Sequence, residues 1–176
     1  MHTNRGFTLI ELLVTITIAA ILAAIAVPNL SDFIKNNRLT TTANDLLADL
    51  ALARSEAAKR GQPVSVCPSS NGSACTAGSW TNGRIVFSDL GSPGTVDGSD
   101  IVIRITESSS AGISIANSGF ANTSHIRYTP SGAMSTAMST EKGKFKICDD
   151  RNGAFGKQVS ISNTGRASIQ SGQTCP

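Results

Sequence analysis

Glu11 is the one charged side chain in an otherwise apolar run from Phe7 to Val27. The run is about as long as the hydrocarbon core of a bilayer requires of a helix. A carboxylate without a partner at mid-membrane costs on the order of 2.5–3.5 kcal/mol. Something must offset that cost, so Glu11 is a candidate for charge pairing.

The residues around Glu11 form a recognisable pattern. Arg5 and Gly6 precede Phe7, Glu11 is the fifth residue counted from Phe7, and Pro28 follows one membrane span later. This pattern resembles the class III leader and N-terminal helix of type IV prepilins and type II secretion pseudopilins. The resemblance implies that a prepilin peptidase cuts between Gly6 and Phe7 on the cytoplasmic face and that the new amine of Phe7 is methylated. The apolar helix then stays in the mature protein.

The same resemblance implies a role in assembly for Glu11, together with Pro28. In that family the carboxylate meets the Phe7 amine of a neighbouring subunit in a stacked filament. The pair sets the register of the subunits, because an unpaired charge in an apolar bundle is costly. Two alternatives stay open. An ordinary secretory signal would be cut after the run, near Ala23–Ala26, and a plain single-span anchor would give no reason for the glutamate.

The four cysteines fall into two groups, Cys67 with Cys75 and Cys148 with Cys175. An even number of cysteines behind an exported helix indicates two disulfides and an oxidising compartment. Three pairings exist, and we favour Cys67–Cys75 and Cys148–Cys175 because each closes a loop inside one apparent unit. A zinc site is the rival, but the chain lacks the C-x-x-C pairs or nearby histidines that zinc prefers.

One long helix is expected from Phe7 to about Arg60, broken or bent near Pro28. Beyond Pro28, apolar side chains recur at the spacing of a helix that packs one face on a core. These positions are Leu39, Ala43, Leu46, Leu47, Leu50, Ala53 or Arg54, and Ala57. Charged residues, Asp49 among them, are expected largely on the other faces. Lys59 and Arg60 before Gly61 predict the C-terminal end.

After Gly61 the pattern changes to short runs rich in β-branched and aromatic residues, many of which alternate apolar and polar side chains. The eight runs are 64–67, 84–87, 101–105, 113–115, 125–128, 144–148, 158–161 and 167–169. They predict two small antiparallel sheets packed against the helix. The fold class is therefore α+β, with a leader (1–6), a transmembrane or filament-core helix (7–28), an amphipathic second half (29–60) and a β-rich head (61–176).

A second resemblance concerns the head. Its sequence resembles the head domain of the GspH/FimT/FimU group of minor pilins and minor pseudopilins. The resemblance is carried by Val64-x-Val66-Cys67-Pro68-Ser69, then Cys75, then Trp80-x-x-Gly83-x-x-x-Phe87-x-Asp89, and Ile161-x-x-x-Gly165-Arg166 also fits. Trp80 and Phe87 are expected to anchor the core. Gly83 and Gly165 are expected in turns.

The C-terminal region carries the basic excess, with seven basic against three acidic residues from position 125 on. In FimT proteins of naturally competent bacteria this region resembles a DNA-binding surface with a Gly-Arg-x-Arg motif. Gly165-Arg166 matches its first half, but Ser168 replaces the second arginine, which removes one phosphate contact. Other basic residues offer a replacement patch: Lys142, Lys144, Lys146, Arg151 and Lys157. Alternation puts the first three lysines on one face of a strand. The simpler interpretation is a solvated face that protects a strand edge.

Enzymatic function is not expected, because the sequence contains no recognisable catalytic motif or phosphate-binding loop. No cofactor and no metal are expected. The stretch Asp149–Gly153 lacks the spacing of a calcium loop and is better explained by an Asn-Gly turn. Asp89, Asp97 and Asp100 could crowd round a cation, which is a weaker alternative.

The sequence thus predicts a minor pilin that helps prime assembly of a type IV pilus and enters it near the tip. The alternatives are a DNA-binding minor pilin for natural transformation and a GspH-like pseudopilin of type II secretion. The expected partners are other minor pilins, the major pilin, the inner-membrane assembly platform and the prepilin peptidase, with DNA as a candidate ligand. The expected location is the bacterial inner membrane, single-pass, with a cytoplasmic N-terminus and a periplasmic head, and the filament after assembly.

Overall fold

The computed structural model describes residues 8–76, 78–121, 124–135 and 142–176. The chain divides into two compact units, residues 1–37 and 38–176, and each is described by itself. Helix α1 (Leu9–Arg60) contributes to both units. All the strands belong to the second unit.

In the first unit, α1 exposes large apolar side chains such as Leu12, Ile18 and Ile25. The helix contains a stretch that is long and apolar enough to cross a membrane. It is uninterrupted at Pro28, so of the two expected forms, broken or bent, the break is wrong. A proline removes the backbone donor that would pair with the carbonyl four residues earlier, here that of Ala24, but the turns on either side stay helical.

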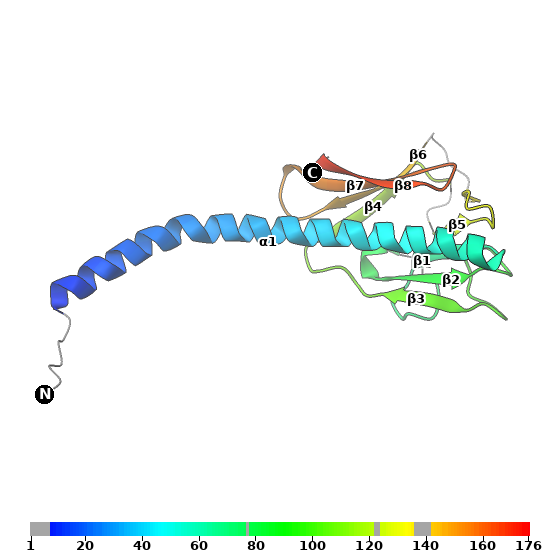
Figure 1. Cartoon of the computed structure of the whole chain (residues 1–176), viewed down its shortest axis with the longest axis horizontal. Helices are drawn as coiled ribbons and strands as arrows, with labels where there is room; N and C mark the ends of the chain where they lie inside the picture. Colours follow the sequence, from blue (N-terminus) through cyan, green and yellow to red (C-terminus); the bar gives the residue numbers. More distant parts are fainter. Residues whose placement is uncertain (1–7, 77, 122–123, 136–141) are drawn as a thin grey trace, which may run out of the picture. The chain divides into compact units, whose positions relative to one another are not determined.

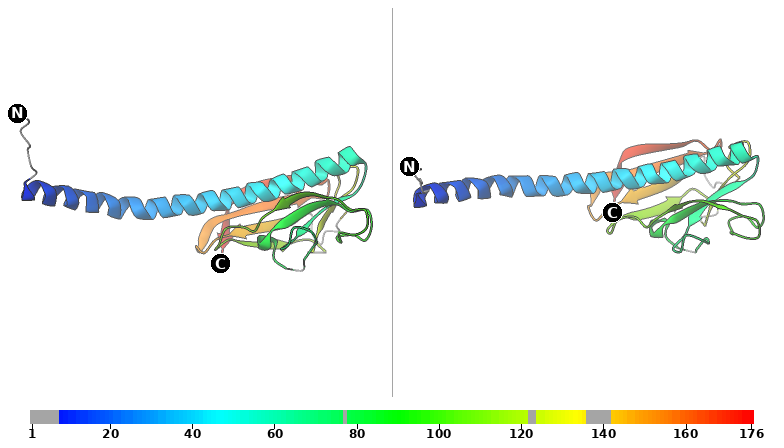
Figure 2. Two further views of the ribbon diagram at one scale, coloured as in Figure 1. Left: turned by 90° about the horizontal axis from the view of Figure 1, so that it is seen from below. Right: turned by 60° about the horizontal axis from the view of Figure 1, so that its bottom comes forward.

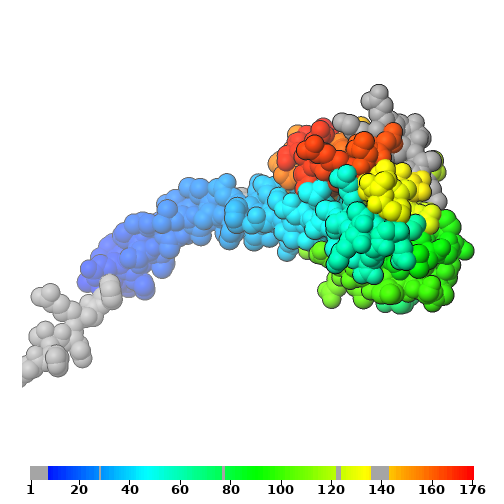
Figure 3. All heavy atoms as spheres, turned by 45° about the vertical axis from the view of Figure 1, so that its right-hand side comes forward, coloured from blue at the N-terminus to red at the C-terminus, as the bar shows by residue number. Residues whose placement is uncertain are grey.

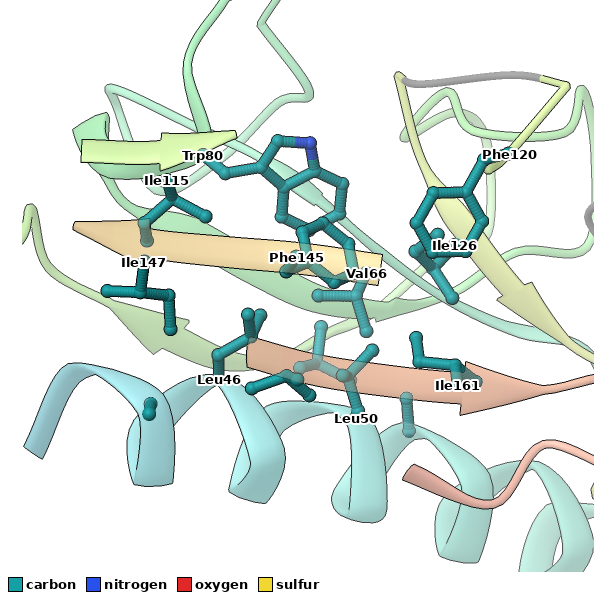
Figure 4. Packing of buried hydrophobic residues seen from close by; sticks show 14 of the residues in the cluster. Leu46, Leu50, Val66, Trp80, Ile115, Phe120, Ile126, Phe145, Ile147 and Ile161 are labelled. Atoms are coloured by element: carbon teal, nitrogen blue, oxygen red, sulfur yellow. The ribbon is translucent and has the colours of Figure 1, made fainter. Parts of the chain in front are cut away.

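In the second unit, one face of α1 forms the centre of the core. Its buried apolar residues are Leu39, Ala43, Leu46, Leu50, Ala53 and Ala57. Their spacing of three or four residues keeps them on one side of a helix. Leu46 and Leu50 point toward side chains of both sheets, such as Val66 and Ile161 (Figure 4). Trp80 packs edge-on against Phe145, with ring centroids 4.7 Å apart.

Within the described residues, eight strands form two antiparallel sheets of four strands, which lie against the C-terminal part of α1 (Figures 1 and 2). Sheet A has the order β3-β2-β1-β5, and sheet B has the order β4-β6-β7-β8. The strands of sheet A are β1 (Val64–Pro68), β2 (Arg84–Ser88), β3 (Val102–Thr106) and β5 (Ile126–Tyr128). Those of sheet B are β4 (Ser114–Ser118), β6 (Lys142–Cys148), β7 (Gly153–Ser162) and β8 (Ala167–Cys175). The predicted α+β fold with two antiparallel sheets is confirmed.

The disulfides join Cys67 to Cys75 and Cys148 to Cys175, which are the pairs favoured from sequence. Cys67 belongs to a small second core with Ile85 and Phe87. Cys148 ends β6 and Cys175 ends β8, so the second disulfide closes sheet B at one end. Trp80 and Phe87 are both buried.

Candidate functional site

The N-terminal end of α1 holds the Glu11 carboxylate within its own chain. Glu11 Oε2 accepts hydrogen bonds from the backbone N–H (2.9 Å) and the hydroxyl (2.8 Å) of Thr8. The backbone N–H of Glu11 donates to the Thr8 hydroxyl at 3.3 Å. This arrangement is a capping box, and the Thr-x-x-Glu spacing could have revealed it from sequence. Gly6 and Phe7, between which cleavage is expected, lie outside the described residues.

Asp49 is buried, which corrects its expected placement on a solvent face of α1. Its Oδ2 atom lies 3.0 Å from Arg84 Nε, and its Oδ1 atom lies 3.2 Å from Arg104 Nε. The hydroxyl of Thr106 donates to the same carboxylate at 2.9 Å. Asp49 lies one turn from Leu46 and Ala53, so it belongs to the core stripe itself. The charge is tolerated there because arginines of β2 and β3 neutralise it.

Asp89 forms a second buried charge cluster at the end of β2. Its Oδ2 atom lies 3.1 Å from Arg127 Nε and accepts hydrogen bonds from the Ser65 hydroxyl and from the Gly94 N–H (3.1 Å). The neighbouring His125 is buried, and burial lowers the pKa of its imidazole; the Arg127 charge adds to this effect, while the Asp89 charge opposes it.

Two of the three aspartates considered for a cation are bonded within their own loop. Asp97 accepts the Ser92 N–H (3.0 Å) and Asp100 accepts the Leu90 N–H (2.9 Å), so both carboxylates stabilise their own loop. Within the described ranges, no three His, Cys, Asp or Glu side chains are arranged to bind a metal. The weaker alternative of a cation among Asp89, Asp97 and Asp100 therefore finds no support.

The basic residues considered for DNA binding are divided among several places. Lys144 and Lys146 flank the buried Phe145 in β6, so they lie on the face of sheet B turned away from the core. The side chain of Lys142 lies outside what the structure describes. Lys157 Nζ donates to the Ser171 hydroxyl at 2.9 Å.

Arg151 is engaged locally. Its guanidinium lies 2.7 Å from Asp149 Oδ2 and 4.3 Å from the centre of the Phe155 ring. Burial opposes ionisation of Asp149, but the hydrogen bonds from Arg151 outweigh it and lower the pKa of the carboxyl. A paired arginine contributes less to an anion-binding patch than a solvated one.

Arg166 lies at a different place again. It lines a groove of about 440 Å³. The other wall of this groove is α1, which contributes Arg54 to the lining. Figure 3 shows this side of the molecule, where the yellow segment near residue 131 lies beside the C-terminal part of α1. Lys144 and Lys146 are not among the residues that line this groove.

Comparison with protein families agrees with these features. The model described as type II transport protein GspH matches residues 42–165. The chain belongs to the GspH family. The model of the prokaryotic N-terminal methylation motif matches residues 1–27, a stretch that includes Glu11. The predicted family of minor pilins and minor pseudopilins is thus confirmed.

Curated relatives of this GspH-family chain are pilus proteins. Fimbrial protein Q of Moraxella bovis is 36% identical over 83 residues, which are 44% of this chain and 53% of the relative. The type IV major alpha-pilin of the same organism is 46% identical over 48 residues, which are 27% of this chain and 30% of the relative. The chain thus spans about half or less of the length of these relatives.

Solved structures share the fold. The type IV minor pilin FimU of Pseudomonas aeruginosa has a TM-score of 0.62 at 22% identity, over 82% of this chain and 99% of that chain. The minor pseudopilin EpsH of the Vibrio cholerae type 2 secretion system has a TM-score of 0.54 at 12% identity, over 76% and 97%. The solution structure of Escherichia coli GspH has a TM-score of 0.51 at 15% identity, over 78% and 90%. These relatives are structural subunits and not enzymes.

Proposed function

We propose that this GspH-family chain is a minor pilin that helps prime assembly of a type IV pilus and is incorporated near its tip. One observation carries the proposal: an N-terminal methylation motif that contains Glu11 is joined to a GspH-type head. The curated relatives are pilus proteins, and FimU has a higher TM-score than EpsH or GspH. Both points favour a pilus over a secretion system.

The physical role follows from the segments of the chain. Residues 1–6 are the leader, which the prepilin peptidase removes, and Phe7 is then methylated. Residues 7–28 hold the subunit in the inner membrane, residues 29–60 continue the helix, and residues 61–176 form a periplasmic head. In the filament the partners are other minor pilins and the major pilin, delivered through the inner-membrane assembly platform.

Glu11 exchanges partners during assembly. In the single chain its carboxylate accepts two hydrogen bonds from Thr8, which offsets part of the cost of keeping it in an apolar helix. In the filament the amine of Phe7 on a neighbouring subunit takes over as the partner of the charge. Because either charge is expensive when left unpaired, only one axial position of the neighbour is favourable.

The decisive experiment is deletion of the chain in its native host, with complementation by the full-length wild-type chain. A priming subunit predicts that surface pili, sheared and quantified by immunoblot, are lost on deletion and restored by complementation. Normal piliation with loss of exported proteins from the medium would instead indicate a type II pseudopilin. That second candidate is favoured by the description of the matching family model as a type II transport protein.

DNA uptake is the third outcome. It predicts normal piliation, lost transformation and salt-dependent binding of DNA to the wild-type chain. Arg151 and Lys157 already bond to Asp149 and Ser171, which disfavours this candidate, because duplex binding relies on several available cations along one surface.

A substitution tests the Glu11 mechanism directly. In the native host, Glu11→Gln is expected to leave the subunit in the membrane fraction but remove it from sheared filaments. Glu56→Gln, which changes a partly exposed ion pair at the other end of α1, is the matched control and should assemble normally. Mass spectrometry of the mature wild-type chain should find an N-methylated Phe7. Retention of residues 1–6, or equal assembly of the Glu11→Gln variant, contradicts the mechanism.

A further inference from the structure

A groove runs along one side of α1, next to the face that packs into the core. Its helix wall is made of residues one turn apart, including Ala51, Ser55 and Ala58. Its other wall comes from the turns at Ser131–Gly132 and Gly165–Ala167. The groove measures about 440 Å³, which is enough for a few side chains of another molecule.

Close backbone contact between the two turns holds that wall in place. A Cβ atom on Gly165 would lie 2.1 Å from the carbonyl oxygen of Gly132, and Gly165 has a φ of +78°. The same carbonyl accepts a hydrogen bond from Arg54 Nε at 3.0 Å. Arg54 is thereby fixed at the groove through one nitrogen. Among the described residues, no carboxylate forms an ion pair with its guanidinium.

The charge of the groove is one-sided. Arg54 and Arg166 are both exposed and both line it, and none of the described residues in its lining is acidic. The remaining lining is small or apolar, as at Leu47, Ala51 and Ala58. Guanidinium groups above an apolar floor match a carboxylate carried on an aliphatic stem, because the fork of an arginine pairs with a carboxylate through two parallel hydrogen bonds.

The shape of the site favours a protein partner over DNA. Backbone binding of a duplex calls for cations spread along one surface, whereas Arg54 and Arg166 lie in a recess between a helix and two turns. Lys144 and Lys146, which would have to extend such a surface, do not line the recess.

We propose that this groove is a docking site for a carboxylate-bearing segment of a neighbouring pilin-class subunit. This inference rests on the proposed assembly function, which supplies such neighbours. Arg54 and Arg166 bind the Asp or Glu side chain, and the small residues of α1 admit the rest of the segment. The contact orients one particular partner on the head, in addition to the pairing of Glu11 in the helix.

The test uses the full-length chain in its native host, with the photoreactive residue p-benzoylphenylalanine in place of Lys59, an exposed residue next to the groove-lining Ala58. Irradiation is expected to join the chain to another pilin-class subunit through a peptide that contains Asp or Glu, identified by mass spectrometry. The yield of this product should fall about tenfold in the Arg54→Glu/Arg166→Glu double variant, because two partly exposed charge pairs together supply about that ratio. Changing the identified acid of the partner to Lys should restore the product.

Two controls separate charge from folding. Arg166→Glu alone keeps the Arg54–Gly132 hydrogen bond and should still reduce the yield. Lys144→Glu makes the same change of charge on the outer face of sheet B and should leave the yield unchanged. Formation of both disulfides on a non-reducing gel verifies that each variant folds.

The alternative outcomes are distinct. An unchanged product in the double variant, no product at all, or a product with nucleic acid overturns the docking site. Loss of pili on deletion together with any of these results would leave the proposed function standing without the groove. A charge-dependent product in a host whose piliation does not need the chain would support the groove and overturn the pilus function.

Discussion

At the scale of single residues, the most consequential side chain in the head is Asp49. Its carboxylate is buried, yet it has two arginine partners and a threonine donor, one from β2 and two from β3. Arg84 is almost as buried as Asp49 and also donates to the carbonyl of Trp80 at 3.3 Å. The cluster therefore links α1 to sheet A through buried ion pairs. Removing one partner of such a pair strongly destabilises a fold, because the other charge is left buried without compensation.

Asp49→Ala is expected to lower the free energy of unfolding of the head by about 3–5 kcal/mol, because it leaves the Arg84 charge buried without its partner. The measurement is chemical denaturation of the detergent-solubilised chain, followed by the fluorescence of Trp80, the only tryptophan. Asp45→Ala on the same helix is the control, with an expected change below about 0.5 kcal/mol. Equal effects of the two substitutions would show that the buried cluster does not stabilise the head.

His125 predicts how stability depends on pH. Its pKa is lowered in the folded head, so the unfolded chain takes up a proton first as the pH falls. Stability is therefore expected to decrease from about pH 7 downward, until the folded imidazole is protonated as well. Denaturation of the wild-type chain and of His125→Gln between pH 7.5 and 5.5 checks this. The variant should lose much of the dependence, and an unchanged slope would exclude His125 as its source.

At the scale of elements, what could be predicted from sequence depended on periodicity. Alternating runs revealed all eight strands, and the spacing of Leu39, Leu46 and Leu50 revealed the buried face of α1. Asp49 was misplaced because periodicity is read from apolar residues, and a charged residue in the core stripe depends on partners that lie more than thirty positions away. Its position one turn from Leu46 was the available signal.

The candidate site could be predicted only in part from the sequence, because local patterns do not show which distant residues meet. Strand alternation correctly placed Lys144 and Lys146 on one face, since that rule is local. It did not show that Arg166 lines the groove, which depends on the contact of the neighbouring Gly165 with Gly132. The capping box of Thr8 and Glu11 was local and could have been recognised.

The turn between β7 and β8 leads to a prediction about Gly165. Gly165→Ala should destabilise the head much more than Gly112→Ala, although both glycines have a φ near +80°. Each substitution carries the strain of a positive φ, on the order of 1 kcal/mol. Only at position 165 does the new methyl group collide with a backbone carbonyl, because Gly112 has nothing within 4 Å. Similar unfolding midpoints for the two variants would contradict the close contact between the turns.

At the scale of the whole molecule, the two disulfides are expected to determine where the head can fold. Cys67–Cys75 closes a separation of 8 residues and Cys148–Cys175 one of 27. Loop-closure entropy assigns them about 2.6 and about 3.6 kcal/mol. Together they approach the entire stability of a typical small domain, about 5–15 kcal/mol. A head of this kind should therefore accumulate only where thiols are oxidised.

Paired substitutions test this expectation. Cys148→Ala with Cys175→Ala should lower stability by about 1 kcal/mol more than Cys67→Ala with Cys75→Ala, because the longer loop gains more freedom when it is opened. Denaturation followed by Trp80 fluorescence measures the difference, and immunoblots of the native host give the steady-state level of each variant. The level should fall further for the Cys148/Cys175 variant, and furthest when all four cysteines are replaced. Undiminished levels of the cysteine-free chain would mean that the packing of α1 on the two sheets is sufficient, so that the head could also fold in a reducing compartment.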